Sequence, residues 1–312
     1  MKIGIVLVTF NRIDKLKIAL QHYKKQSYPF EYIVIVDNHS TDGTAEFLKE
    51  WLAEKDSFQK YCVTLDSNTG GAGGFYEGMK KSLSLDADWV WLSDDDAYPR
   101  PDAFEKIAEY YERQLPEQQN RIVALCSAVY NKGQIHKEHR NHLNVSRWKV
   151  KIQSTTLDEY KNEAIKIDIF SYVGAAIKKS ALLEVGLDRK EFFIYCDDQE
   201  HSLRLGRAGD IFCVTSSIVD HDTPPFDPKL INWGRYYKRR NDLLMIKLNF
   251  PYRYYFLRYW KRYWMDVSFH SKNPKVLKKL LRAAHSDAWR DRTGVHEVYK
   301  PGWNPEEDEE SL

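Results

Sequence analysis

The sequence predicts an α/β protein in which a mostly parallel sheet is flanked by helices and followed by a helical C-terminal extension. In its first third, short apolar runs alternate with segments of helical spacing. Strands that alternate with helices form parallel sheets, because each crossover helix returns the chain to the same end of the sheet. Beyond residue 232 the chain becomes aromatic and basic. We expect an α/β domain over residues 1–240 and a helical extension over residues 241–312.

The spacing of apolar residues gives the individual elements. Continuous apolar runs predict strands over residues 3–9, 32–36, 62–65 and 89–93, and helical spacing predicts helices over residues 14–26, from the turn at 37–44 to residue 53, and over 74–83. After residue 121 the alternation loosens. Strands are expected there over residues 122–130, 171–177 and 211–214, with a helix over residues 197–207.

A polar, basic stretch over residues 131–151 separates two of these later strands. We expect it to be a mobile or acceptor-facing insertion. It contains the evenly spaced His136, His139 and His142, which could bind a metal ion. A solvated loop is the favoured interpretation, because no pattern of supporting residues accompanies the three histidines.

Composition narrows the class of protein. The 312 residues, 43% of them hydrophobic, can bury a substantial core. A net charge of +2 does not favour nucleic-acid binding, and no nucleic-acid module is recognised. The four cysteines are scattered without a metal-binding pair, which indicates reduced thiols and a cytoplasmic protein. No apolar run approaches the roughly 18 residues of a membrane-spanning helix.

Three carboxylates, Asp94, Asp95 and Asp96, directly follow the fourth predicted strand. Open α/β sheets bind ligands at the carboxyl ends of their strands, and crowded carboxylates there repel one another unless a cation joins them. Alternation along the backbone lets Asp94 and Asp96 share one side, which makes a site for Mg²⁺ or Mn²⁺. The alternative is a solvated acidic turn.

Polar residues also follow the first two strands. Asp37 can accept hydrogen bonds from a nucleobase, although a helix-capping role fits the same turn. Thr9 and Asn11 offer further polar groups beside it, and Arg12 could meet a phosphate.

The segment after the third strand is rich in glycine: Asn68 is followed by Gly70, Gly71, Gly73 and Gly74. We expect a loop whose backbone N–H groups approach a phosphate and which aims a helix N-terminus at it. The segment is neither a P-loop nor a complete dinucleotide fingerprint, because Tyr76 occupies the last glycine position. The alternative is a flexible tight turn.

A further acidic group, Asp197, Asp198 and Glu200, opens a predicted helix that also carries Arg204. Acids at a helix start are often caps, but an acid among other acids and aromatic side chains can have the raised pKa that suits a general base. Arg204 could orient an acid or bind a diphosphate. His221, which follows a late strand, could join an oxygen-rich metal site.

Helical spacing over residues 254–267 groups aromatic and basic residues on opposite faces. The aromatic face holds Phe256, Trp260, Tyr263, Trp264 and Val267, and the basic face holds Arg258, Lys261 and Arg262. Such a helix can lie on an anionic membrane surface. Packing against the α/β domain or in a homo-oligomer interface is the alternative.

Taken in order, these motifs resemble those of the family 2 GT-A glycosyltransferases, and within them the bacterial galactofuranosyltransferase and rhamnosyltransferase branch. The resemblance spans about the first 240 residues and is carried by the turn at Thr9–Arg12, the glycine-rich segment, the acidic triplet, the Asp197–Arg204 segment and His221. It implies a GT-A fold, a catalytic domain over residues 1–240, a UDP-sugar donor and inversion at the anomeric carbon.

The resemblance also implies roles for particular residues. The set implied for donor binding is Thr9, Asn11, Arg12, Asp37 (at the nucleobase), Asn68, Gly70, Gly71, Gly73, Gly74, Asp94 and Asp95. The implied ligands of Mn²⁺ or Mg²⁺ are Asp94, Asp96 and His221. Asp198 would be the catalytic base, with Asp197, Glu200 and Arg204 facing or orienting the acceptor side. Asp198 would accept the acceptor proton while the cation stabilises the leaving diphosphate.

The expected activity is transfer of a sugar, with galactofuranose favoured, to a lipid-linked glycan in the synthesis of a bacterial surface polysaccharide. The enzyme would be cytoplasmic or peripheral on the inner face of the membrane. Three alternatives remain: a rhamnosyltransferase that uses dTDP-rhamnose, a nucleotidyltransferase without a separate base at Asp198, and a degenerate protein that binds glycan or membrane without catalysis.

Overall fold

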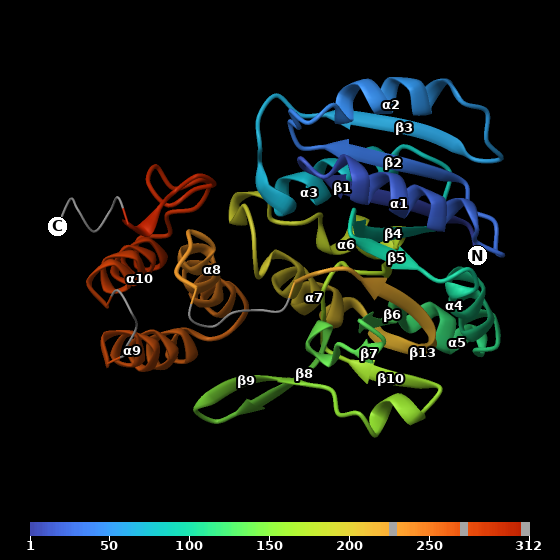
Figure 1. Cartoon of the computed structure of the whole chain (residues 1–312). Coiled ribbons are helices and arrows are strands. Elements are labelled where there is room, and N and C mark those ends of the chain that lie inside the picture. Colours follow the sequence, from blue (N-terminus) through green and yellow to red (C-terminus); the bar gives the residue numbers. More distant parts are fainter. Residues whose placement is uncertain (225–229, 269–273, 307–312) are drawn as a thin grey trace.

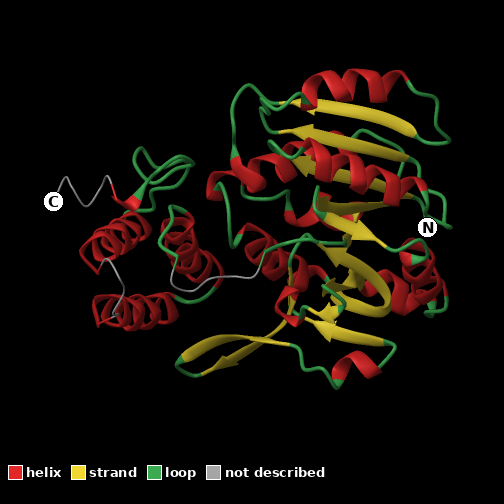
Figure 2. Cartoon of the chain, viewed as in Figure 1, coloured by secondary structure: helices red, strands yellow, loops and turns green. Residues whose placement is uncertain are grey.

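The computed structural model describes residues 1–224, 230–268 and 274–306, with side chains of residues 267 and 268 left out. Helices lie on both faces of one large sheet, and three C-terminal helices pack beside it (Figures 1 and 2). The first half consists of β1 (Ile3–Thr9), α1 (Ile13–Lys24), β2 (Tyr32–Asp37), α2 (Thr44–Ala53), β3 (Gln59–Thr64), α3 (Gly70–Leu83) and β4 (Trp89–Asp94). Each of the expected early strands and helices is therefore present.

The second half of the sheet is mixed. It is built from β5 (Ala97–Pro99), α4 (Ala103–Glu112), α5 (Pro116–Arg121), β6 (Ile122–Asn131), β10 (Ala164–Ile167), β12 (Ala175–Lys178), α6 (Lys179–Val185), α7 (Asp197–Ala208) and β13 (Asp210–His221). The strand order is β10-β13-β6-β12-β4-β1-β2-β3, and β12 runs antiparallel to both of its neighbours. The expected mostly parallel sheet is confirmed, with antiparallel strands confined to its second half and edge.

The alternation of side chains along β1 explains why the sheet is covered on both faces. Ile3, Ile5 and Leu7 pack with α1, α2 and α4, whereas Val6 and Val8 pack with α3, α6 and α7. Successive residues of a strand point to opposite faces, so a continuous apolar run belongs to a strand buried on both sides.

Two segments expected as loops form regular structure, and whether the insertion over residues 131–151 faces an acceptor stays a prediction. The stretch over residues 131–151 is ordered: it forms β7 (Gln134–Ile135), β8 (Arg140–Ser146) and the start of β9 (Lys149–Ser154), and β8 pairs with β9 and with β11 (Ile169–Phe170). The glycine-rich segment is the first turn of α3, which begins at Gly70 and not at Gly74. Contacts from other elements outweigh the low helix propensity of glycine there.

The C-terminal part forms α8 (Gly234–Asn249), α9 (Tyr252–Ser268) and α10 (Pro274–Trp289), as the helical spacing predicts. In α9, Tyr259 and Tyr263 pack against His285 of α10, whereas Trp260 and Trp264 are exposed. Tyr263 therefore does not belong to the exposed aromatic face, and the side chain of Val267 lies outside the described residues. The division of the chain at residue 240 stays a prediction, and this residue lies inside α8. No helix in the described part of the chain has the length and apolar character to cross a bilayer.

Candidate active site

The parallel register of β1, β2 and β4 brings their carboxyl ends to one edge of the sheet. Thr9 is aligned with Asp37, and Val8 with Asp94. The polar residues that follow the three strands therefore meet at this edge, which is where open α/β sheets bind ligands.

Asp94, Asp96 and His221 offer ligand atoms that all lie within 4.8 Å of one another. The pairing of β13 with β5 brings His221 here, because it places that residue opposite Ala97. His221 Nε2 lies 3.2 Å from Asp96 Oδ1, and Lys15 Nζ lies 3.5 Å from the other oxygen of that carboxylate. The structure thus brings together the three residues expected to bind a metal ion.

The charges of the acidic triplet are unequally compensated. Burial and then the charge of Asp96 raise the pKa of Asp94 to about 7. Burial also acts to raise the pKa of Asp96, but His221 and Arg12 outweigh it and lower that pKa. His221 and Arg12 also act on Asp94 and lower its pKa, but there they do not outweigh burial and the charge of Asp96. Two carboxylates and one imidazole are a donor set that suits Mn²⁺ or Mg²⁺, so the residues present fit the expected divalent ion.

Asp95 is turned away from this cluster and supports it. Its carboxylate accepts a hydrogen bond of 2.7 Å from Thr9 Oγ1 and lies 3.2 Å from Arg12 Nη1. Arg12 Nη1 also lies 2.9 Å from Asp96 Oδ2. Burial, opposed by Arg12, raises the pKa of Asp95 to about 6. Thr9 and Asp95 are buried, so their direct role is to fix the turn, whereas Arg12 is exposed enough to reach a ligand.

Asn11 and Asp37 join the turns that follow β1 and β2. Asn11 Oδ1 accepts a hydrogen bond of 2.7 Å from the N–H of Thr41, and Asp37 Oδ1 accepts one of 3.0 Å from the N–H of Ser40. The turn-stabilising role that competed with nucleobase binding at Asp37 is therefore present in the structure. The bond to Ser40 uses only one carboxylate oxygen of Asp37, so a contact between the other oxygen and a nucleobase stays a proposal.

Asn38 is a residue of this edge that the sequence did not single out. Its Nδ2 donates to the carbonyl of Gly70 at 2.8 Å, and its Oδ1 accepts from the N–H of Thr69 at 2.8 Å. Asn68 Oδ1 accepts from the N–H of Gly70 at 2.8 Å. These bonds satisfy N–H groups at the start of α3, which helix formation leaves without partners. An asparagine in a turn gives no sequence signal for this long-range contact.

Three of the four glycines expected to bind phosphate are required by packing. Gly70 has a φ of +72°, and a Cβ there would lie 1.9 Å from the carbonyl oxygen of Phe193. A Cβ at Gly74 would lie 2.5 Å from Val8, and one at Gly73 would lie 2.2 Å from Thr69. A Cβ at Gly71 would have no described atom within 4 Å. Gly71 is therefore the position where a ligand could approach the start of α3.

Asp197 and Asp198 occupy the first turn of α7, and Asp188 joins them from the preceding loop. Burial raises the pKa of Asp197 to about 6, and burial followed by the charge of Asp197 raises the pKa values of Asp188 and Asp198 well above their usual range. Asp188 Oδ2 is buried with no hydrogen-bond partner among the described residues. The charge of Asp94 also raises the pKa of Asp198, which links the two acidic groups.

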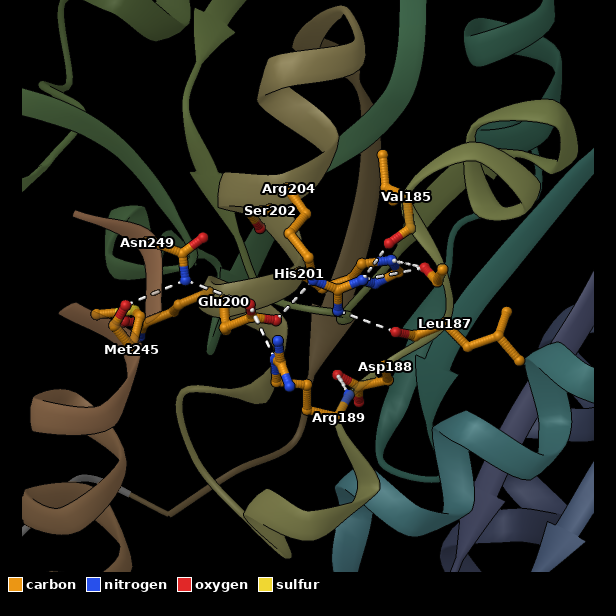
Figure 3. Close-up of polar contacts among 12 residues, drawn as sticks. Val185, Leu187, Asp188, Arg189, Glu200, His201, Ser202, Arg204, Met245 and Asn249 are labelled. Carbon is orange, nitrogen blue, oxygen red and sulfur yellow. Dashed lines mark hydrogen bonds and ion pairs between the residues drawn. The ribbon is translucent and has the colours of Figure 1, made fainter. Parts of the chain in front are cut away.

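Glu200 and Arg204 of α7 belong to a polar network with Arg189 and with backbone carbonyls of the segment that precedes this helix (Figure 3). Glu200 accepts a hydrogen bond of 2.8 Å from Arg204 Nε and forms an ion pair with Arg189, whose Nε lies 3.1 Å from Oε1. Arg204 also donates to the carbonyls of Val185 and Leu187, at 2.8 and 2.9 Å. Of the two roles expected for these residues, the geometry favours orientation of the segment that carries Asp188. Their polar atoms are engaged within the protein, which argues against direct contact with an acceptor or diphosphate.

The interpretation of His136 and His139 as part of a solvated loop was wrong. His139 Nε2 lies 3.2 Å from His136 Nδ1, and its ring centroid lies 5.2 Å from that of His221. Burial, followed by the charge of Arg140, lowers the pKa of His139 well below its usual value. Ring nitrogens of His136, His139 and His221 lie within 4.8 Å of one another, so they are a second group that could hold a metal ion.

His142 lies apart from this group and pairs with Glu159 at 2.6 Å. The even spacing of the three histidines in the sequence therefore does not reflect a common site. His136 and His139 lie before and at the end of the short turn at Lys137–His139, whereas His142 lies in β8.

Sequence comparisons support a sugar-transferring site. Glycosyl transferase family 2 matches this chain over residues 4–186. Galactofuranosyltransferase GlfT1 of Mycobacterium tuberculosis is 37% identical over 94 residues, which are 30% of this chain and 30% of that protein. GlfT1 of Mycolicibacterium smegmatis is 34% identical over 94 residues, with the same coverage of both chains. The chain thus aligns with less than a third of the length of these curated relatives.

Solved structures share the fold at low sequence identity. TarS of S. aureus in complex with UDP-GlcNAc is 13% identical, with a TM-score of 0.55, over 91% of this chain and 72% of that one. Mannosyltransferase PcManGT from Pyrobaculum calidifontis, in complex with GDP-Man and Mn²⁺, is 15% identical, with a TM-score of 0.55, over 93% of this chain and 75% of that one. The expected GT-A fold is confirmed.

Proposed function

Because the chain belongs to glycosyl transferase family 2, we propose that it transfers a sugar from a nucleotide diphosphate donor to a hydroxyl group of a glycan, with inversion. The observation that carries the proposal is the convergence of Asp94, Asp96 and His221 at the sheet edge, electrostatically coupled to Asp198. The cluster of Asp94, Asp96 and His221 suits a metal-bound diphosphate, and Asp198 suits removal of a proton. In an inverting transfer, a base takes the proton of the acceptor hydroxyl, and positive charge stabilises the leaving diphosphate on the opposite face of the sugar.

Asp94, Asp96 and His221 would hold Mn²⁺ or Mg²⁺, which supplies positive charge to the leaving diphosphate. Thr9 and Asp95 hold the turn that positions this cluster, and Arg12 adds a cation that can contact a phosphate. Asp37 would face the nucleobase, with Asn68 and the open side of Gly71 toward the donor. The solved relatives with UDP-GlcNAc and with GDP-Man and Mn²⁺ support a nucleotide sugar and a divalent cation as partners.

Asp198 would act as the base that accepts the proton of the acceptor hydroxyl. Burial and the charge of Asp197 raise its pKa, so the ionised carboxylate binds a proton strongly. Glu200 and Arg204 would orient the helix and the preceding loop around it. The acceptor hydroxyl would approach from the side of α7, opposite the leaving diphosphate.

We favour galactofuranose from a UDP-sugar as the transferred group, with a lipid-linked glycan of the bacterial cell surface as acceptor. The partial similarity to GlfT1 supports this choice over dTDP-rhamnose. The reaction would take place at the inner, anionic face of the cell membrane.

A panel of nucleotide sugars tests the proposal. The full chain is incubated with each donor, with Mn²⁺ or with chelator, and release of the nucleoside diphosphate is measured with and without a galactan acceptor. We expect UDP-galactofuranose and Mn²⁺ to give the highest rate. A higher rate with dTDP-rhamnose would show that the donor is dTDP-rhamnose and not UDP-galactofuranose. The absence of metal-dependent binding of any donor would indicate a degenerate site.

A further inference from the structure

A groove of about 520 Å³ lies between the β8–β9 hairpin and α9, away from the acidic residues of the candidate active site. Tyr254 Oη of α9 donates to the carbonyl of Ser146 at 2.9 Å, and Arg258 Nη1 donates to the carbonyl of Val150 at 3.2 Å. These bonds fix the helix against the hairpin at one side of the groove. The volume is within the range of sites that bind small molecules.

The lining of the groove is strongly basic. Its charged members are Lys149, Lys151, Arg258, Lys261 and Arg262, and no described residue that lines it is acidic. The positive charges of the two arginines are balanced in part by one carboxylate, that of Asp242. It lies 3.0 Å from Arg258 Nε and 3.4 Å from Arg262 Nε.

The lysines of the groove are not compensated in this way. Lys149 and Lys261 are exposed and have no carboxylate partner within the described part of the chain, and Lys151 bonds only to the amide oxygen of Gln153, at 3.0 Å. The groove therefore presents excess positive charge that an anionic ligand would neutralise.

Apolar side chains continue from the groove along the surface of α9. Leu257, Lys261 and Met265 line the groove and form one row at helical spacing. The neighbouring row consists of Phe256, Trp260 and Trp264, which are exposed by 44%, 41% and 66%. Large aromatic side chains beside uncompensated lysines are typical of surfaces at the boundary between water and lipid.

We propose that this groove binds the phosphate headgroup of an anionic membrane lipid, and that the row Phe256, Trp260 and Trp264 enters the interface of the bilayer beside it. A soluble phosphate would account for the lysines but not for the exposed aromatic row. A second copy in a two-fold contact would place the same uncompensated lysines against one another. The proposal rests on the membrane location given in the proposed function and adds the site that would hold it there; lipid binding itself requires neither donor nor transfer, so the two are tested separately.

Co-sedimentation with vesicles tests the headgroup site. The full chain is mixed with phosphatidylcholine vesicles that either contain or lack phosphatidylglycerol. We expect binding to the anionic vesicles to be about tenfold stronger and to weaken as salt rises. The double variant Lys149→Glu and Lys261→Glu should lose about tenfold or more in binding. The matched control Lys49→Glu and Lys55→Glu makes the same charge change at exposed positions around the end of α2 and should bind as the wild type does.

Fluorescence tests the aromatic row independently of the lysines. Vesicles that carry brominated phosphatidylglycerol should quench part of the tryptophan emission, and Trp260→Phe with Trp264→Phe should remove the quenched part. Equal binding to neutral vesicles, full binding by the lysine variant, or the absence of quenching would each overturn the proposal. UDP binding with Mn²⁺ is measured on the same variants, so failure of lipid binding and failure of the donor site are distinguished.

Discussion

At the scale of single residues, burial determines the charge of the carboxyl groups around α7. The charge of Asp197 raises the pKa values of Asp188 and Asp198, the charge of Asp198 also raises that of Asp188, and Asp188 lacks a hydrogen-bond partner at Oδ2 among the described residues. Such groups resist ionisation. This resistance makes Asp198 a strong proton acceptor once it is ionised, which suits its proposed role as the base.

Replacement of Asp198 by Asn tests this role. The amide keeps the shape and the bond to the N–H of Gln199 but cannot accept the acceptor proton. Transfer should fall by about 10²–10⁴-fold, while UDP binding with Mn²⁺, measured by calorimetry, should change less than about threefold. A variant with wild-type turnover would show that the base lies elsewhere.

The dependence of activity on pH has a definite sign. Because the pKa of Asp198 is raised, and because the base must be ionised to accept a proton, turnover should increase as pH rises through that pKa. Measurement of kcat from pH 5 to pH 9 with saturating Mn²⁺ and donor gives the profile. Turnover that falls over the same range would contradict an ionised carboxylate as base.

Replacement of Asp188 by Asn should stabilise the protein at alkaline pH. The pKa values of Asp188 and Asp197 are raised in the folded protein, that of Asp197 to about 6. These two acids therefore stabilise the fold most at a pH below their pKa in the unfolded chain, near 4, and this stabilisation is lost as pH rises through their pKa in the folded protein. The neutral amide removes this loss. We expect a gain on the order of 1–3 kcal/mol at pH 8, which shrinks toward pH 4. Urea unfolding at both values measures it, and a gain that is larger at pH 4 would contradict the assignment.

At the scale of elements, the start of α3 depends on close backbone contacts. Gly70→Ala should destabilise the protein by about 2–4 kcal/mol, because the new Cβ meets the carbonyl of Phe193 and φ is positive. Gly71→Ala is the matched control, since its Cβ meets no described atom within 4 Å, and stability should change by about 1 kcal/mol or less. Thermal unfolding compares the two. Equal stability of the variants would show that this packing is not required.

The elements that the sequence predicted are those with a periodic apolar pattern. β1 and α1 follow from local spacing, because each side chain that gives the pattern is buried in the core. β8 and β9 were missed because much of each strand is exposed or only partly buried, so they lack the pattern of a core strand. The start of α3 was missed because its glycines argue against a helix, and the contacts that override them come from Asn38 and Phe193.

The same reason explains which site residues could be found. Asp94, Asp96 and Asp198 stand in local motifs, at strand or helix ends where the chemistry can be read from neighbouring residues. Asp188 and His139 reach the site only through tertiary packing. His139 was assigned to a solvated loop because the pairing of β8 with β9 and β11 is not visible in the local sequence.

At the scale of the whole molecule, the C-terminal helices are connected to the candidate active site. Asn241 of α8 donates from Nδ2 to the carbonyls of Phe192, Ile194 and Tyr195, each at 2.9 Å. This loop leads directly into α7, and Tyr195 has a positive φ of 67°. The extension therefore helps to fix the position of Asp198.

Replacement of Asn241 by Ala should thus affect both stability and turnover. Loss of this buried donor leaves the carbonyls of Ile194 and Tyr195 without it, at a cost of about 2–4 kcal/mol, whereas the carbonyl of Phe192 keeps its bond from Arg240 Nη2. Chemical unfolding measures the stability, and assays under conditions where the variant is fully folded measure kcat, which should decrease while UDP binding stays close to that of the wild type. Unchanged stability and unchanged kcat would show that α8 packs beside the site without supporting it.

The central claim is that Asp94, Asp96 and His221 hold a divalent cation which binds the diphosphate of the donor. The most direct measurement is calorimetric titration of UDP into the full chain, with Mn²⁺ and with excess chelator, for the wild type and for Asp96→Asn. We expect binding that requires Mn²⁺ and that weakens about tenfold or more in the variant. Equal affinity for UDP in chelator, or an unchanged affinity in Asp96→Asn, would contradict the claim.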